Sequence, residues 1–63
     1  MTPPREYTGF KDILDKPIMV GDTVQFDDCF RYYFVAKRNG VYVIENDEFV
    51  FYLGEVANML VKM

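Results

Sequence analysis

Two groups of carboxylates are the side chains of this 63-residue sequence that could bind a metal ion or transfer a proton. Their oxygens suit hard cations such as Ca²⁺, which takes about six to eight oxygen ligands. Neither group has the spacing of an EF-hand loop, so we interpret both as solvated carboxylates at turns and strand ends and expect no metal site. The groups are Asp22, Asp27 and Asp28, and Glu45, Asp47 and Glu48.

Cysteine and histidine chemistry is restricted in the same way. The sequence has one cysteine and no histidine, so it lacks an internal disulfide, a zinc ligand set and the usual general base. Arg31, two residues after Cys29, would lie on the same side of a strand and could lower the pKa of the thiol. We interpret Cys29 as a small packed apolar residue. The sequence therefore predicts a non-enzymatic protein with no cofactor and no small-molecule substrate.

The run from Phe30 to Arg38 is the strongest candidate for recognition, because it mixes aromatic and basic side chains. Tyrosine and arginine are enriched in binding hot spots, so alternate residues of this run and of the next predicted strand would suit a protein partner. A second copy of the chain, in a homodimer, is a further partner for the same surface. The predicted partner-binding residues are Arg31, Tyr33, Val35, Lys37, Tyr42 and Ile44.

The same run offers an alternative function, which is nucleic-acid binding by an SH3-like or OB-like module. Such barrels stack bases on sheet aromatics and hold phosphates with flanking cations. The formal net charge of −3, from seven basic and ten acidic residues, opposes attraction to phosphates and to anionic lipid. Nucleic acid is therefore the less favoured partner. The residues that this alternative would use are Arg31, Tyr33, Lys37 and Arg38.

A central hairpin, residues 30–45, must position these side chains. Its two halves are rich in β-branched and aromatic residues, and Asn39-Gly40 between them is typical of a two-residue turn. Such a turn sets a register in which Val35 faces Ile44 and Lys37 faces Tyr42. The predicted binding residues then share one face. The opposite face is also apolar and carries Phe30, Tyr32, Phe34, Ala36, Val41 and Val43.

The segments around the central hairpin complete a single small domain, residues 7–63. Prolines in residues 1–6 disfavour a helix, and this lead is expected to be flexible. A first hairpin is expected with strands at 7–10 and 18–19, followed by a strand at 23–26.

The C-terminal segment allows two interpretations. After a strand expected at 49–53, apolar residues at helical spacing predict a short helix or 3₁₀ turn that begins near Gly54. A last strand at 59–63 is the alternative, because Gly54 starts a helix poorly and Val61 is β-branched. All elements together predict an all-β fold, either a small SH3-like barrel or a curled antiparallel sheet. The helically spaced residues are Leu53, Val56, Ala57 and Leu60.

The length of the chain makes its stability small. A domain of about 60 residues buries only about 60% of the surface of its unfolded chain, so such scaffolds commonly need a disulfide, a metal, a partner or dense packing. Because both faces of the central hairpin are apolar, its sheet needs two covers. Curling of the sheet can supply one cover, and the C-terminal tail or a partner can supply the other.

The sequence favours a cytoplasmic protein that does not bind membranes. No apolar run approaches the roughly 20 residues that span a bilayer. The pair Pro3-Pro4 lies where a signal peptide would need an apolar segment. A single unpaired cysteine also suits a reducing compartment.

Residues 7–24 resemble the opening of a known family. Tyr7-Thr8-Gly9-Phe10-Lys11-Asp12, followed by Lys16, Ile18 and Gly21-Asp22-Thr23-Val24, is similar to YTGLKDKNGKEIYEGDIV, the opening of the YopX family of phage and prophage proteins. The chain departs from this pattern at three places. Leu14-Asp15 replaces an Asn-Gly turn, Pro17 replaces an acidic residue, and Val20 replaces a glutamate.

The resemblance implies a phage or prophage origin and a β-rich, partly barrel-like fold. It carries over no catalytic residue. It supports the hypothesis that the chain acts in the host cytoplasm by binding and inhibiting a host or defence factor, as an anti-CRISPR protein does. We expect the matched residues themselves to be architectural and to fold a first hairpin that covers the central one.

Overall fold

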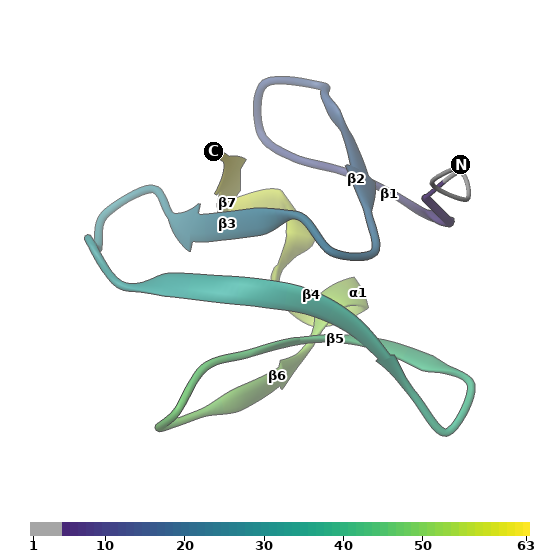
Figure 1. Ribbon diagram of the computed structural model, residues 1–63. Coiled ribbons are helices and arrows are strands. Elements are labelled where there is room, and N and C mark those ends of the chain that lie inside the picture. The colour runs from purple at the N-terminus through teal and green to yellow at the C-terminus, as the bar shows by residue number, and fades with distance from the viewer. Residues whose placement is uncertain (1–4) are drawn as a thin grey trace.

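The computed structural model describes residues 5–63, which form strands, a short α-helix and a 3₁₀ turn (Figure 1). The expectation of a small all-β fold is confirmed. The elements are β1 (Tyr7–Lys11), β2 (Pro17–Met19), β3 (Thr23–Phe26), β4 (Tyr32–Arg38), β5 (Val41–Glu45), β6 (Val50–Tyr52), α1 (Leu53–Val56), η1 (Ala57–Met59) and β7 (Leu60–Lys62).

The strands form two separate sheets. β1 and β2 pair as an antiparallel hairpin, and the other strands make a five-stranded antiparallel sheet in the order β6-β5-β4-β3-β7. The edge strands β6 and β7 do not pair with each other in the part of the chain that the structure describes. The larger sheet is therefore open, which matches the predicted antiparallel sheet and not a closed barrel.

The central hairpin has the predicted register. Val35 pairs with Ile44, and Lys37 pairs with Tyr42. Asn39 and Gly40 both have positive φ, at 51° and 79°. Positive φ at both central positions is what a type I′ turn requires, and the twist of that turn matches the twist of the flanking strands.

Both interpretations of the C-terminal segment are correct, each for a part of it. The helical turns α1 and η1 come first, and the chain then forms β7, which pairs with β3. Gly54 in α1 leaves room for the first hairpin, because a Cβ atom there would lie 3.2 Å from the ring of Phe10. The helically spaced apolar residues of the tail therefore lie in α1 and η1 as far as Ala57, and Leu60 begins the edge strand β7.

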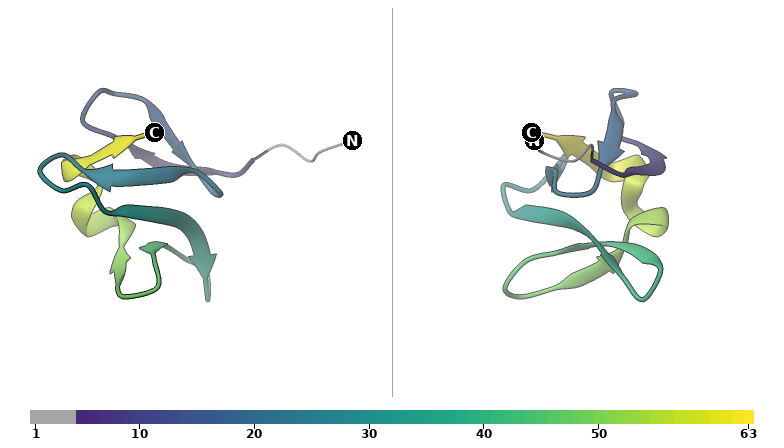
Figure 2. Two further views of the ribbon diagram at one scale, coloured as in Figure 1. Left: turned by 60° about the vertical axis from the view of Figure 1, so that its left-hand side comes forward. Right: turned by 45° about the vertical axis from the view of Figure 1, so that its right-hand side comes forward.

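The core lies on one side of the five-stranded sheet, which we call the inner face. α1 contacts β5 and β6, and η1 contacts β1. The helical segment and β1 lie on the same side of the sheet, at the right in the right-hand view of Figure 2. The rings of Phe26, Tyr33 and Phe51 meet edge to face with centroids 5.4–5.8 Å apart. The buried core residues are Ile18, Val24, Tyr33, Val35, Ile44, Leu53, Val56, Ala57 and Leu60.

Asp12 fastens the loop of the first hairpin to the C-terminal strand. Its carboxylate is buried and accepts backbone N–H groups from Leu14 at 2.9 Å, Lys16 at 2.8 Å and Lys62 at 2.9 Å. Burial raises the pKa of Asp12, but the N–H groups of Lys62, Lys16 and Leu14 together outweigh burial. The pKa of Asp12 therefore lies below its ordinary value.

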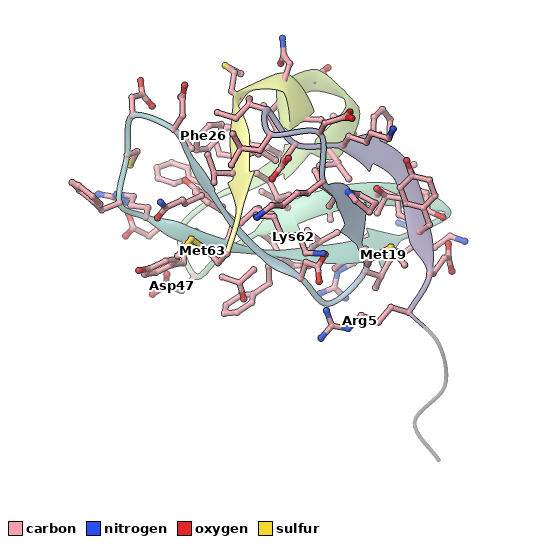
Figure 3. All side chains as sticks on the ribbon, turned by 90° about the horizontal axis from the view of Figure 1, so that it is seen from above. Arg5, Met19, Phe26, Asp47, Lys62 and Met63 are labelled. Atoms are coloured by element: carbon pink, nitrogen blue, oxygen red, sulfur yellow. The ribbon has the colours of Figure 1, made fainter. Side chains whose placement is uncertain are left out.

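Asp22 makes a second buried junction, between the first hairpin and β4. Its carboxylate accepts the N–H of Met19 at 2.8 Å and forms ion pairs with Lys62, at 3.2 Å, and with Arg5. Its backbone oxygen accepts the N–H of Val35 at 2.9 Å. Met19 and Lys62 are seen at this junction in Figure 3.

Residues 5 and 6, which precede β1 and were assigned to the flexible lead, contact the domain that was predicted to begin at residue 7. Arg5 pairs with Asp22, and the backbone oxygen of Glu6 accepts the N–H of Val20 at 2.9 Å. Arg5 supplies a cation to the buried carboxylate of Asp22. Residues 1–4 of the predicted flexible lead lie outside the described residues.

Replacement of Asp12 by alanine tests the first of these junctions. Three buried or half-buried N–H groups would lose a charged acceptor, so we expect the free energy of unfolding at pH 7 to fall by about 3 kcal/mol or more. Urea unfolding measures this fall. Asp12→Asn, which keeps one acceptor oxygen, should lose less and is the second variant if the alanine form does not fold. Asp28→Ala, at an exposed site, should change stability by at most about 0.5 kcal/mol.

The same pair of proteins gives the pH dependence. The native pKa of Asp12 lies below the unfolded value of about 3.9, so its contribution is complete above about pH 5 and is lost as the pH falls through the native pKa. The difference in free energy of unfolding between wild type and Asp12→Ala should therefore become smaller as the pH is lowered below about 5. A difference that is constant with pH, or no larger than that of Asp28→Ala, would contradict the role of Asp12.

Candidate protein-binding surface

The predicted partner-binding face is mostly the inner face, which is a correction to the sequence analysis. Tyr33, Val35 and Ile44 are only 4%, 2% and 0% exposed. They are buried because α1, η1 and the first hairpin all cover this side of the sheet. These three side chains hold the fold together and are not accessible to a partner.

The charged residues of the predicted site are exposed and lie at opposite ends of β4. Arg31 Nη1 is 2.7 Å from Glu48 Oε2, and Lys37 Nζ is 3.1 Å from Glu6 Oε2. The carboxylate of Glu48 raises the pKa of Arg31. Each cation already has an anionic partner, so neither is free for a phosphate.

Tyr42 is half-buried and joins Lys37 through Glu6. Its hydroxyl donates to the Glu6 carboxylate, and Lys37 Nζ lies 5.5 Å from the centre of its ring, a cation–π distance. Hydrogen bonds from Tyr42 and then from Lys37 lower the pKa of Glu6, and the same carboxylate raises the pKa of Tyr42 and of Lys37. The structure thus brings two of the predicted residues, Lys37 and Tyr42, together with Glu6 in one cluster, which we call the Glu6 cluster.

The opposite side of the sheet, which we call the outer face, carries a group of uncovered apolar side chains. Paired residues of neighbouring strands share a face, and the register aligns the alternate residues of β4, β5 and β6. Five apolar side chains of this face are 45–63% exposed. They are Tyr32 and Phe34 of β4, Val41 of β5, and Val50 and Tyr52 of β6.

An ion pair crosses the centre of the outer face. Arg38 Nη2 lies 2.8 Å from Glu45 Oε1, and the register places the pair Ala36–Val43 between these two residues along the strands. Val43 is only 4% exposed although it points outward. Its cross-strand partners are Ala36 on β4 and Tyr52 on β6.

A shallow hollow lies beside the ion pair over β5 and β6. It has a volume of about 440 Å³ and is lined mainly by Val41, Val43, Val50 and Tyr52 together with Arg38. The exposed rings of Tyr32 and Phe34 stand on the neighbouring strand β4. The outer face therefore has both protruding rings and an apolar depression.

The net charge of the chain is concentrated at one end of the sheet. The β3–β4 and β5–β6 loops meet there through the Arg31–Glu48 ion pair, at the left in Figure 1. Four carboxylates and Arg31 give these loops, which we call the acidic end, a formal charge of −3, and the other six acidic and six basic residues cancel. Phe30 in this end is 92% exposed. The carboxylates are Asp27, Asp28, Asp47 and Glu48.

Metal-binding and reactive groups are not brought together. Within residues 5–63, no three His, Cys, Asp or Glu side chains are placed to hold one metal ion. Asp22 is buried and forms an ion pair with Lys62. It therefore does not join Asp27 and Asp28 in a carboxylate cluster, although the three residues are close in sequence. Cys29 is a free, half-buried thiol. In the same range, no helix has the length and apolarity to cross a bilayer.

One signal in the sequence could have identified the outer face. Phe51 pairs with Ile44, and Leu53, two residues later, stays on the same side of the chain as the apolar stripe of α1 begins. This alternation leads the helix onto the inner face. Use of this signal requires knowledge of the β5–β6 register, and the sequence Asn46-Asp47-Glu48-Phe49 between the two strands does not determine that register.

No protein-family model, curated protein or solved structure matches this chain. The resemblance of residues 7–24 to the YopX opening therefore stays a prediction. Its residues have an identifiable structural role. Asp12 and Asp22 make the two buried junctions, and the buried hydroxyl of Thr8 donates to the backbone oxygen of Ile18 at 2.7 Å.

The Glu6 cluster can be tested by titration of Tyr42. Glu6→Gln removes the negative charge beside Tyr42, so the pKa of Tyr42 should fall toward the ordinary value of about 10. NMR of ¹³C-labelled tyrosine between pH 7 and pH 12 measures this shift. Glu55→Gln, a matched change on α1, should leave the Tyr42 titration unchanged. An equal pKa of Tyr42 in wild type and Glu6→Gln would show that the Glu6 cluster does not form.

Proposed function

We propose that the chain is a non-enzymatic protein that acts by binding another protein, and that the outer face is its binding surface. The observation that carries this proposal is that one side of the sheet is covered, whereas five apolar side chains on the other side stay about half exposed. The largest contiguous apolar patch on a monomer covers about 300–600 Å² and is often functional. Tyrosine and phenylalanine on this face are also typical of interface cores.

The outer face has the composition expected of a protein interface. Its exposed groups are aromatic rings and β-branched side chains, and its two charges, Arg38 and Glu45, neutralise each other. A partner would therefore meet a mainly apolar surface with little charge to desolvate without compensation. Such a surface favours another apolar protein surface over a charged polymer.

Nucleic-acid binding has less support as the alternative. Tyr33, the ring that would stack on a base, is 4% exposed. Arg31, Lys37 and Arg38 each have an acidic partner within 3.1 Å. The acidic end, which contains Arg31 itself, would also repel phosphates. A basic stripe free of acidic partners, which such binding needs, is not found among residues 5–63.

A narrower proposal concerns the kind of partner. The resemblance of residues 7–24 to the YopX opening supports an SH3-like phage-type protein that works in the host cytoplasm and inhibits a host or defence factor by binding it. The residues that carry the resemblance fasten the first hairpin to the inner side of the sheet. The family likeness thus concerns the scaffold, and the outer face would supply the specificity.

Affinity capture with matched tyrosine variants tests the proposed function. Tyr52→Thr removes a 59%-exposed ring from the outer face, and Tyr7→Thr removes a 45%-exposed ring from β1 on the first hairpin. Immobilised at about 1 µM in bacterial lysate, wild type and Tyr7→Thr should retain the same protein. Tyr52→Thr should retain at least about tenfold less, as expected for a hot-spot ring.

Two outcomes would contradict the proposed function. One is that wild type captures nothing above background under gentle salt. The other is that Tyr52→Thr and Tyr7→Thr capture the partner equally. Circular dichroism of both variants checks that each keeps the native fold.

A further inference from the structure

We propose that the open edge of β6 pairs with an extended segment of a partner protein, which adds an antiparallel strand to the five-stranded sheet. The segment has apolar residues at alternate positions, followed by Lys or Arg. This inference rests on the proposed function, because it takes the partner to be another protein. It adds the form and the chemistry of the segment that the partner would present.

The backbone groups of Val50 and Tyr52 point away from the sheet at this edge. In an antiparallel pair, residues that exchange both backbone hydrogen bonds alternate with residues that exchange none. The N–H of Asn46 donates to the backbone oxygen of Phe49 at 3.0 Å, so Phe51 is the next residue of β6 that bonds to β5. Val50 and Tyr52, on either side of Phe51, therefore direct their N–H and C=O groups outward.

Three of these outward groups are available to a partner. The C=O of Tyr52 is the N-cap oxygen of α1, which accepts the first hydrogen bond of the helix. The N–H and C=O of Val50 and the N–H of Tyr52 have no neighbouring strand, because β6 is the edge of the sheet, at the bottom in Figure 1. Among residues 5–63, no loop backbone bonds to them. An added strand would supply the missing donors and acceptors.

The other edge of the sheet, β7, is closed by the first hairpin. The backbone oxygen of Leu60 accepts the N–H of Ile13 at 3.0 Å, and the N–H of Lys62 donates to the Asp12 carboxylate at 2.9 Å. The N–H of Leu60 donates to the oxygen of Ala57. These contacts use the groups that an added strand would need, so the structure favours β6 over β7 as the edge for pairing.

The side chains of β6 favour apolar residues at alternate positions of the segment. Val50 and Tyr52 are 63% and 59% exposed and line the hollow on the outer face. Residues that face them in an added strand would place their side chains on the same face. Apolar side chains at those two positions would cover the exposed sides of Val50 and Tyr52 and extend the outer face.

The charge beside β6 favours the basic residues and sets their position. β6 begins directly after the acidic end, which has a formal charge of −3. An antiparallel segment runs from Tyr52 toward Val50, so its C-terminal end lies beside Asp47 and Glu48. Lys or Arg at that end would complement the acidic end. A second β6 lacks this complement, because residues 46–55 carry three carboxylates and no cation.

NMR titration with a synthetic peptide tests the pairing directly. In acetyl-Thr-Val-Thr-Val-Lys-Lys-amide, the valines would face Tyr52 and Val50. We expect a dissociation constant on the order of 1 mM, because only about three backbone hydrogen bonds form. The amide signals of Val50 and Tyr52 should shift most as the peptide reaches about 5 mM. No shift at this concentration, or larger shifts on another element, would overturn the proposal.

N-methylation of the peptide separates backbone pairing from side-chain contact. A methyl group on the nitrogen of the valine that faces Val50 removes the donor to the Val50 oxygen, so the affinity should fall at least about tenfold. The threonine between the valines directs its N–H away from β6, so its N-methylation should leave the affinity nearly unchanged. Equal losses from the two methyl groups would overturn the pairing.

A matched pair of substitutions makes the same test on the chain. Val50→Pro removes an N–H that does not bond to β5, and proline is tolerated on an edge strand at such a position. Val50→Thr shortens the apolar side chain to the same extent as a control but keeps the N–H. Peptide binding should weaken more in Val50→Pro than in Val50→Thr, and the reverse order would contradict the role of the backbone. Circular dichroism checks the fold of both variants.

A change of peptide charge tests the chemistry of the segment. With two glutamates in place of the lysines, the affinity should fall several-fold, and the difference between the two peptides should decrease in Asp47→Asn. Equal affinities of the two peptides would overturn the basic partner. Shifts of Val50 and Tyr52 that depend on chain concentration without peptide would also overturn it, in favour of a second copy.

These measurements separate this inference from the proposed function. Capture of a protein that depends on the Tyr52 ring but is unchanged in Val50→Pro would leave the proposed function intact and overturn strand addition. Pairing of the peptide with β6, together with no captured protein, would do the reverse.

Discussion

Asp12 and Asp22 are buried carboxylates at the two contacts between the first hairpin and the five-stranded sheet, and the remaining structure depends on them. Asp12 binds three backbone N–H groups, one of them from β7, and Asp22 binds Met19 while pairing with Lys62. A chain of this size has only about 3–9 kcal/mol of stability at ordinary values per residue. Hydrogen bonds to a charged group contribute about 1.5–3 kcal/mol each, so either junction is expected to supply a large part of this stability.

These junctions determine which side of the sheet is covered. They hold Ile18 against the inner face, where Leu53 and Leu60 from the tail complete the core. The chain has two apolar sheet faces but places both of its covers on one of them. The outer face stays open because no described segment is left to cover it, and its exposed rings are the observation from which a binding role is proposed.

Much of the fold could be predicted from the sequence, because local patterns determine it. Asn39-Gly40 defines the turn and, through it, the Val35–Ile44 pairing. The choice of buried face could not be predicted in this way, since both faces of the hairpin are apolar and each carries charged residues. That choice depends on long-range contacts such as Asp12 with Lys62, fifty residues apart. The predicted binding residues Tyr33, Val35 and Ile44 were assigned to the wrong face for this reason.

The measurement that tests the central claim most directly is the solvent exposure of side chains along β4, measured by NMR with a water-soluble paramagnetic agent. The account predicts strong relaxation of the ring protons of Tyr32 and Phe34 and protection of the methyl groups of Val35 and Ile44. The opposite pattern, with Val35 and Ile44 relaxed and Phe34 protected, would contradict it and return the binding surface to the other side of the hairpin.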